Sequence, residues 1–301
     1  MLQGFIAIVA SSIIAGLLPI LQKQLVSDGL PILSMMLFNA LTMEIMTFVI
    51  SRIRRNSLKI SRKQLLQAVL MGPAGTFVIT AMLNYAYLTI PVGTAQMIHY
   101  FYPTVTCIIM GVIFQQKLTW LKAAAIGSST AGLMLLAGKS GALAPEGLVL
   151  AFGSALLYGV FLVCNEKGTV NELPLEVKMF YTSLPSLILM AILAPATSNF
   201  QLPAGIKGWT MLLTGALIGA LLCSFLLFYG IKKLGASTAS FISILCPVVS
   251  LAASAVWFGE KITEIMVAGS ALILASALLI TLDGAGIALK RVRTSEAAAE
   301  A

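Results

Sequence analysis

The chain has 301 residues, of which 59% are apolar and 10% charged, and its mean hydropathy is +0.98. Because a water-soluble domain carries about a quarter charged residues, this composition excludes an ordinary soluble protein and indicates a membrane protein. The net charge of +8 would suit nucleic-acid binding, but the basic residues lie mostly in short segments between apolar stretches. We therefore interpret them as determinants of membrane topology and expect no nucleic-acid partner.

Apolar stretches of about 20 residues, the length that crosses a bilayer as a helix, follow one another along the chain. The first of them, MLQGFIAIVASS, has no basic region and no signal-peptide cleavage site, so we interpret it as a retained span. The alternating pattern of a membrane barrel is missing, which predicts an all-α polytopic bundle. Turn residues and charges delimit ten expected transmembrane helices, at 4–24, 31–51, 64–88, 93–114, 119–137, 147–166, 178–196, 208–230, 236–258 and 264–286.

The basic residues between these spans are distributed unevenly. Fifteen Lys and Arg fall on one side of the membrane, whereas the other side holds Lys139, Lys207 and Lys261, with Lys23 near a span end. Since cytoplasmic loops carry the excess of positive charge, we expect both termini in the cytoplasm. We expect an integral protein of a bacterial cytoplasmic membrane.

The second half of the chain repeats the first. Residues 4–31 align without gaps on 147–174, and 84–105 align on 228–249. The matched positions include Gly4 and Gly147, Ser11 and Ser154, Gly16 and Gly159, Pro31 and Pro174, Thr94 and Thr238, and Pro103 and Pro247. We expect two five-helix repeats, 1–138 and 139–288, and a cytoplasmic tail, 289–301. Because five is odd, the second repeat would enter the membrane inverted, the arrangement of alternating-access carriers.

The fourth and ninth spans carry a resemblance to a known family. NYAYLTIPVGTAQMIHYFYPTVTCIIMGVIFQQKLT, at 84–119, is echoed by FYGIKKLGASTASFISILCPVVSLAASAVWFGEKIT, at 228–263. Ten spans in a 5+5 inverted repeat with these segments resemble the drug/metabolite transporter superfamily, EamA-type branch. The FGEKIT ending is typical, and FQQKLT departs from it. The resemblance implies transport of a small metabolite, but members handle amino acids, quaternary amines, sugars and nucleotide-sugars, so it does not name the substrate.

One polar face of the fourth span recurs in the ninth. Gln96, His99 and Tyr102 share a helical face, and the repeat mates of Gln96 and His99 are Ser240 and Ser243. Because polar side chains are costly in contact with lipid, we expect these five residues to line a substrate cavity. The prolines that follow, Pro103 and Pro247, each remove a helical hydrogen bond and are predicted hinges.

The single histidine has alternative interpretations. His99 could simply join two helices through a hydrogen bond, or form a Ser–His pair with Ser154 or Ser128 in an intramembrane hydrolase. A metal site needs further ligands, and the four dispersed cysteines, Cys107, Cys164, Cys223 and Cys246, do not supply them. We expect no metal, no cofactor and no enzymatic activity.

Glu44 stands alone as a carboxylate deep in the second span, with Asn39 five residues earlier. An ionised carboxylate is costly there, so protonation and release could couple transport to the proton gradient, with His99 as a second candidate proton site. The alternative is a protonated, hydrogen-bonded Glu44 with a structural role. Asn39 is a candidate cavity residue.

Tyrosines could complete the cavity as an aromatic cage for an amphipathic or cationic substrate, although most tyrosines near span ends anchor the interface. Tyr102 and Tyr158 are the first candidates for the cavity, and Tyr85, Tyr181 and Tyr229 come after them. No Lys or Arg lies in the middle third of any expected span, which disfavours phosphorylated substrates.

The prediction is a secondary transporter of a zwitterionic, neutral or cationic amphipathic metabolite, such as an amino acid, with export as the expected direction. The alternatives are a non-transporting receptor or scaffold and, less favoured, the hydrolase. The expected partners are a small-molecule substrate and the lipid bilayer, with a monomer as the expected state and a dimer left open.

Overall fold

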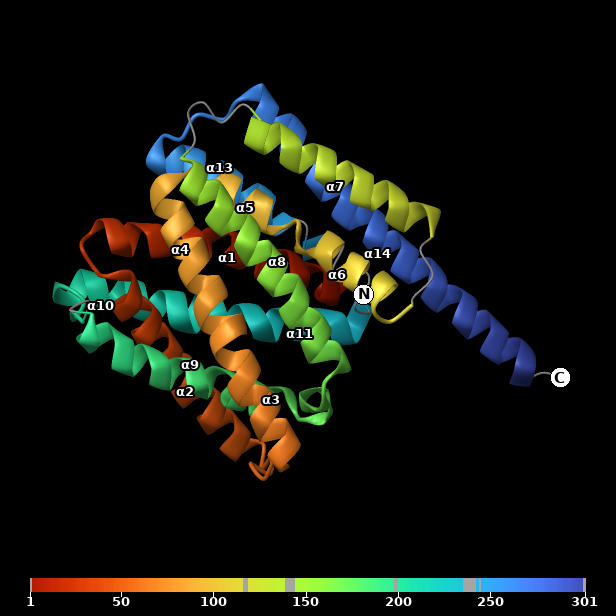
Figure 1. The fold of residues 1–301 in the computed structure, drawn as a ribbon. Helices are drawn as coiled ribbons and strands as arrows, with labels where there is room; N and C mark the ends of the chain where they lie inside the picture. The colour runs from red at the N-terminus through yellow and green to blue at the C-terminus, as the bar shows by residue number, and fades with distance from the viewer. Residues whose placement is uncertain are drawn as a thin grey trace.

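The computed structural model describes residues 2–115, 119–138, 144–197, 200–234, 242–243 and 245–299. These residues form helices joined by short connections, with no strand in the ranges just given. Figure 1 shows the helices packed side by side in one bundle, with the C-terminal part of the last helix extending beyond it. The expected all-α class is confirmed.

The long helices overlap expected spans, and the last of them continues past its expected end at 286. They are α1 (Leu2–Ser27), α2 (Ile32–Ile53), α7 (Trp120–Gly138), α8 (Pro145–Lys167), α9 (Leu175–Ala196) and α14 (Glu264–Ala299). Among the described residues, six helical segments are long and apolar enough to cross a membrane, and shorter apolar helices span Trp120–Leu136 and Leu245–Phe258. The chain is therefore a polytopic membrane protein, while the count of ten spans stays a prediction.

Proline marks where several helices begin. Pro31, Pro91 and Pro174 are the N-caps of α2, α5 (Val92–His99) and α9, and Pro145 is the first residue of α8. The first helical turn has no internal partner for its N–H groups, so a residue that lacks an N–H is tolerated there. The apolar stretches are thus cut into separate helices at these prolines.

Two of the helical segments contain a π-helical turn. The first runs through α3 (Arg62–Gly72), the π-helix η1 (Pro73–Val78) and α4 (Ile79–Thr89). The second runs through α10 (Gly205–Thr214), the π-helix η4 (Gly215–Leu222) and α11 (Cys223–Leu234). Such turns widen the helix locally and are frequent at functional sites.

The segment that carries the lone histidine is broken in the middle. Helix α5 ends at His99, and α6 (Tyr102–Val112) begins after a two-residue turn, with Pro103 in its first turn. Pro103 cannot donate to the carbonyl of His99, the acceptor four residues earlier. In the second half, Pro247 lies in the first turn of α13 (Leu245–Phe258).

The bundle is held together by a few extensive helix pairs. Helix α1 packs on α11 and α13, α8 packs on α4, α5 and α6, and α2 packs on α9. Helices α7 and α14 form the most extensive pair and lie together at one side of the bundle (Figure 1). The outer surface is apolar: Ile206 and Val256, for example, are 83% and 87% exposed, as expected of a surface that faces lipid.

Candidate functional site

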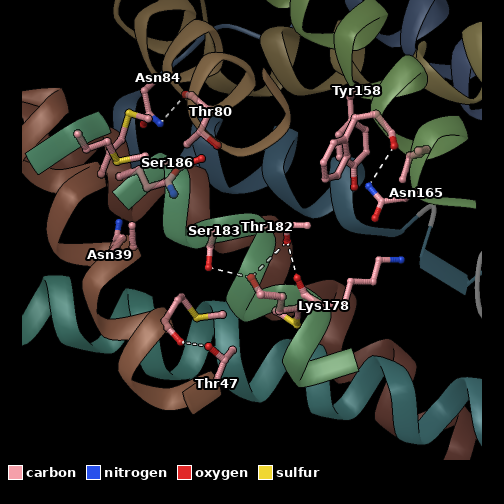
Figure 2. A pocket seen from close by; sticks show the side chains of 18 of the residues that line it. Asn39, Thr47, Thr80, Asn84, Tyr158, Asn165, Lys178, Thr182, Ser183 and Ser186 are labelled. Carbon is pink, nitrogen blue, oxygen red and sulfur yellow. Dashed lines mark hydrogen bonds between the residues drawn. The ribbon is translucent and has the colours of Figure 1, made fainter. Parts of the chain in front are cut away.

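A cavity of about 540 Å³ lies between α2, α4, α8 and α9. Its polar side chains include three asparagines, Asn39, Asn84 and Asn165, together with Ser186 and one charged group, Lys178. Figure 2 shows that Asn165 and Lys178 lie at one end of the cavity, and Asn84 and Ser186 toward the other. A volume of this size suits a small-molecule ligand.

The apolar part of this wall is rich in methionine. It includes Met35, Met36, Met43, Met179 and Met190. Thioether side chains are flexible and polarisable, so they adapt to apolar groups of different shape and make favourable contacts with aromatic rings. The cavity therefore combines an adaptable apolar wall with separate polar groups.

Two of these asparagines have unused acceptors. The side-chain oxygens of Asn39 and Asn84 are buried and have no hydrogen-bond partner among the described residues. The amide nitrogen of Asn84 donates to the carbonyl of Thr80 at 2.9 Å, as Figure 2 shows. Since buried polar atoms are nearly always paired, these oxygens indicate a place for a donor from water or a ligand.

Glu44 lies directly behind the cavity wall. Its neighbour along α2, Met43, lines the cavity, as does Ser183 of α9, whose hydroxyl donates to one carboxylate oxygen of Glu44. The other oxygen has no partner among the described residues, and the side chain is buried. The sequence-predicted carboxylate is thus separated from the cavity by a single hydroxyl.

A second cavity of about 500 Å³ lies beside the break between α5 and α6. It is lined by Tyr102, Pro103, Ser243 and Cys246, and it shares Tyr158 and Leu227 with the first cavity. The phenol of Tyr158 therefore stands where the two cavities meet.

His99 lies next to this junction but does not line either cavity. Its ring centroid is 5.1 Å from that of Tyr158 and 5.6 Å from that of Tyr102. Its Nδ1 lies 2.9 Å from Ser154 Oγ, whose hydroxyl donates to the carbonyl of Ala151 at 2.6 Å. Because the Ser154 proton is used there, His99 Nδ1–H is the donor to Ser154. The pair is a buried link between α5 and α8, and Ser154 is fully buried.

The other sequence-predicted residues lie away from the two cavities. Gln96 donates to the hydroxyl of Tyr87 at 2.6 Å, and the hydroxyl of Tyr181 donates to the carbonyl of Leu58 at 2.7 Å. Tyr85 and Tyr229 are 44% and 43% exposed on the outer surface. Ser240 falls outside the described residues.

Comparison with known proteins gives these cavities a context. The sequence model of the EamA-like transporter family matches residues 2–138 and again residues 145–282. The chain belongs to the EamA-like transporter family. This confirms the resemblance and supports a transporter as the class of protein in which the two cavities lie.

The chain is also similar to one curated protein and to one solved structure. A probable terminal-alkyne amino-acid exporter from Streptantibioticus cattleyicolor is 24% identical over 215 residues, which cover 70% of this chain and 71% of that protein. A solved crystal structure has a TM-score of 0.64 and 18% identity, and the match covers 93% of this chain and 96% of the other. At 18% identity, the similarity to the solved structure shows a shared fold.

Several cavity residues were missed by sequence reasoning. The cavity face of α9 includes Lys178, Thr182 and Ser186, and their spacing of four is a helical stripe that the sequence does contain. Asn84 and Asn165 also line this cavity, although they lie toward the ends of the expected spans 64–88 and 147–166. Polar residues at such positions are ordinarily interpreted as interfacial, and this concealed them.

Proposed function

We propose that this EamA-family protein is a secondary transporter that moves a small amphipathic metabolite, such as an amino acid, out of the cell by alternating access. The observation that carries the proposal is the pair of cavities that meet at Tyr158 in the middle of the bundle. A path that is interrupted at one aromatic side chain can be opened to either side by small movements of the surrounding helices. Neither an enzymatic step nor a cofactor forms part of the proposal.

The inverted repeat, 1–138 against 139–288, is part of this proposal. A Cβ added at Gly16 would lie 2.5 Å from the carbonyl oxygen of Cys246. A Cβ added at its repeat mate, Gly159, would lie 3.2 Å from the carbonyl oxygen of Tyr102, the repeat mate of Cys246. Matched glycines thus make matched contacts, α1 on α13 and α8 on α6. This supports two similar halves that can exchange conformations.

The helix pairs and π-helical turns support the same symmetry. The third helical segment of each half contains one of the two π-helices, η1 or η4. Helix α9 packs against α3 and η1, and α2 packs against α10 and η4. In this arrangement, Pro103 and Pro247 are proposed as equivalent hinges. The N-terminus and the tail 289–301 are proposed to lie in the cytoplasm, because the basic residues between the spans are expected on that side.

The proposed pathway uses part of the predicted residue set. Asn39, Tyr102, Tyr158 and Ser243 form its wall. Gln96 and His99 act from behind the wall, where His99 supports the rings of Tyr102 and Tyr158. The outward tyrosines, Tyr85 and Tyr229, and the packed Tyr181 are proposed as anchors at the surface.

Glu44 is the proposed site of proton coupling. Its position between the cavity-lining Met43 and Ser183 supports this role, because a carboxylate so close to the substrate could exchange its proton as the substrate enters or leaves. The direction and the amino-acid class are taken from the exporter of Streptantibioticus cattleyicolor. The proposed location is the cytoplasmic membrane, with the basic loops on the cytoplasmic side, as the charge distribution predicts.

Proteoliposomes test the proposal. Counterflow of a panel of amino acids, amines and neutral metabolites should exceed that of empty liposomes for at least one compound. Ala40→Trp, which fills the cavity from α2, should abolish that flux. The matched control is Leu41→Trp, because Leu41 is the next residue and is 41% exposed. Folded wild-type protein without flux for any compound class would refute transport, and equal flux in both tryptophan variants would refute this pathway.

A further inference from the structure

Lys178 has an unusual position for a basic residue of this chain. It lies in the first turns of α9 and is the one charged side chain among the described residues that line the 540 Å³ cavity. It is half-buried and makes no ion pair or side-chain hydrogen bond within the described part of the chain. The sequence alone favours a topology determinant, but such a residue would face water or headgroups rather than a cavity wall.

Among the side chains that the structure describes, no carboxylate near Lys178 is ready to neutralise it. Glu176, two residues earlier, accepts hydrogen bonds from Arg54 and Asn56. Glu44 accepts from Ser183 and does not line the cavity. An ammonium that is half removed from water, with no counter-ion among the described side chains, favours binding of an anionic group.

Near Lys178, one further donor remains for such an anion, the second amide proton of Asn165. Asn165 of α8 lies at the same end of the cavity (Figure 2), and its amide nitrogen donates to the carbonyl of Phe161 at 3.0 Å. The hydroxyl of Thr182 donates to the carbonyl of Lys178 at 2.8 Å, which ties this first part of α9 together. Beyond Lys178 the wall continues with Met179 and Met43, so an anionic head at Lys178 would place an apolar tail against thioethers.

We infer that Lys178 binds the carboxylate of the substrate, and that the substrate is an amphipathic monocarboxylate whose apolar part lies against the methionine wall. The inference rests on the proposed function and narrows it, because it removes purely cationic amphipathic compounds from the substrate class. A single ammonium suits a monoanion, whereas a phosphate dianion is ordinarily held by several fixed cations.

Matched acids and amides test the inference. L-leucine, L-methionine and L-phenylalanine are each compared with the corresponding amide, which keeps the side chain and the ammonium but lacks the carboxylate. Binding to purified full-length protein is measured by equilibrium dialysis, and flux is measured in parallel in proteoliposomes. Wild type should bind at least one acid about 10- to 100-fold more tightly than its amide, the range expected for a hydrogen bond to a charged group.

The variants separate charge from packing. Lys178→Met should abolish the preference for the acid, and Lys178→Arg should retain most of it. Lys63→Met is the control, since Lys63 is an exposed lysine in the first turn of α3 and lines neither cavity. Lys178→Gln serves as a second variant, and gel filtration and thermal unfolding verify that each protein is folded.

The outcomes distinguish the inference from the proposed function. Three outcomes overturn the inference. The first is equal binding of acid and amide by wild type, the second is a preference for the acid that survives in Lys178→Met and Lys178→Gln, and the third is no binding of any of the three acids. Flux that does not depend on Lys178 overturns the inference and leaves transport intact. Binding that depends on Lys178 without any flux supports the inference and refutes transport.

Discussion

Replacing Gly16 by alanine places a methyl group in the contact between α1 and α13. The added Cβ would lie 2.5 Å from the carbonyl oxygen of Cys246 and 2.8 Å from Cβ of Val249. Gly159→Ala does the same between α8 and α6, with Cβ 2.8 Å from Cβ of Val105. Since carbon atoms ordinarily approach one another to about 3.5 Å or more, each pair of helices has to separate by about 0.7 Å or more.

The magnitude follows from two opposing contributions. Alanine is favoured over glycine inside a helix by about 1 kcal/mol, whereas overpacking a close contact costs about 1–3 kcal/mol. The acceptor at Gly16 is a backbone oxygen, which cannot rotate away, so the upper part of that range applies. We expect a net loss of unfolding free energy of about 2 kcal/mol for Gly16→Ala and about 1 kcal/mol or more for Gly159→Ala.

Thermal unfolding in detergent, followed by tryptophan fluorescence, measures this loss. The control is Gly127→Ala, because nothing lies within 4 Å of a Cβ added at Gly127 and the variant gains only helix propensity. Gly16→Ala should unfold about 4–8 °C below wild type, and Gly127→Ala at or above wild type. If Gly16→Ala and Gly159→Ala unfolded like the control, the close glycine contacts and the symmetry argument built on them would be refuted.

Three further predictions concern the ends and the centre of the bundle. Lys23 and Glu260 form a mostly buried ion pair at 2.8 Å, so Lys23→Met should lower unfolding stability by about 3 kcal/mol. The double variant with Glu260→Gln should lose less than the sum of the single losses, as measured by a thermal double-mutant cycle. Glu44→Gln should abolish accumulation driven by a pH gradient in proteoliposomes but retain counterflow, and equal loss of both would contradict proton coupling. Pro103→Ala and Pro247→Ala should stay folded but shift the labelling of engineered cysteines from each side, and unchanged labelling with unchanged transport would remove both as hinges.

Helix positions were predictable because they depend on local properties of the chain. Apolar length marks the spans, and prolines such as Pro31, Pro145 and Pro174 mark their starts, since each excludes a continuing helix before it. The partner of each helix is not a local property. Lys178 illustrates this limit: its sequence neighbourhood is that of an interfacial lysine, and only the packing of α9 on α2, with α8 also lining the cavity, brings it to a cavity wall.

The stripe around His99 shows a second limit. Gln96, His99 and Tyr102 share a face only if one regular helix continues through all three, at about 100° per residue. The chain instead turns at Tyr100 and Phe101, because Pro103 cannot continue the hydrogen-bond pattern of α5. Gln96 and His99 therefore bond sideways to Tyr87 and Ser154, while Tyr102 lines the second cavity.

The break itself could have been predicted from Pro103, but not the rotation of the helix that follows, which depends on contacts across the break. Those contacts are long-range: Tyr102 meets Tyr158 edge-on, with ring centroids 4.8 Å apart, and Gly159 admits the backbone of Tyr102 at a distance that leaves little room for a side chain. Tyr158 and Gly159 both belong to α8 and lie more than 50 positions after Tyr102 in the chain. A helical stripe that ends at a proline is therefore evidence for two faces rather than one, and here the residue beyond the break, Tyr102, reaches the cavity.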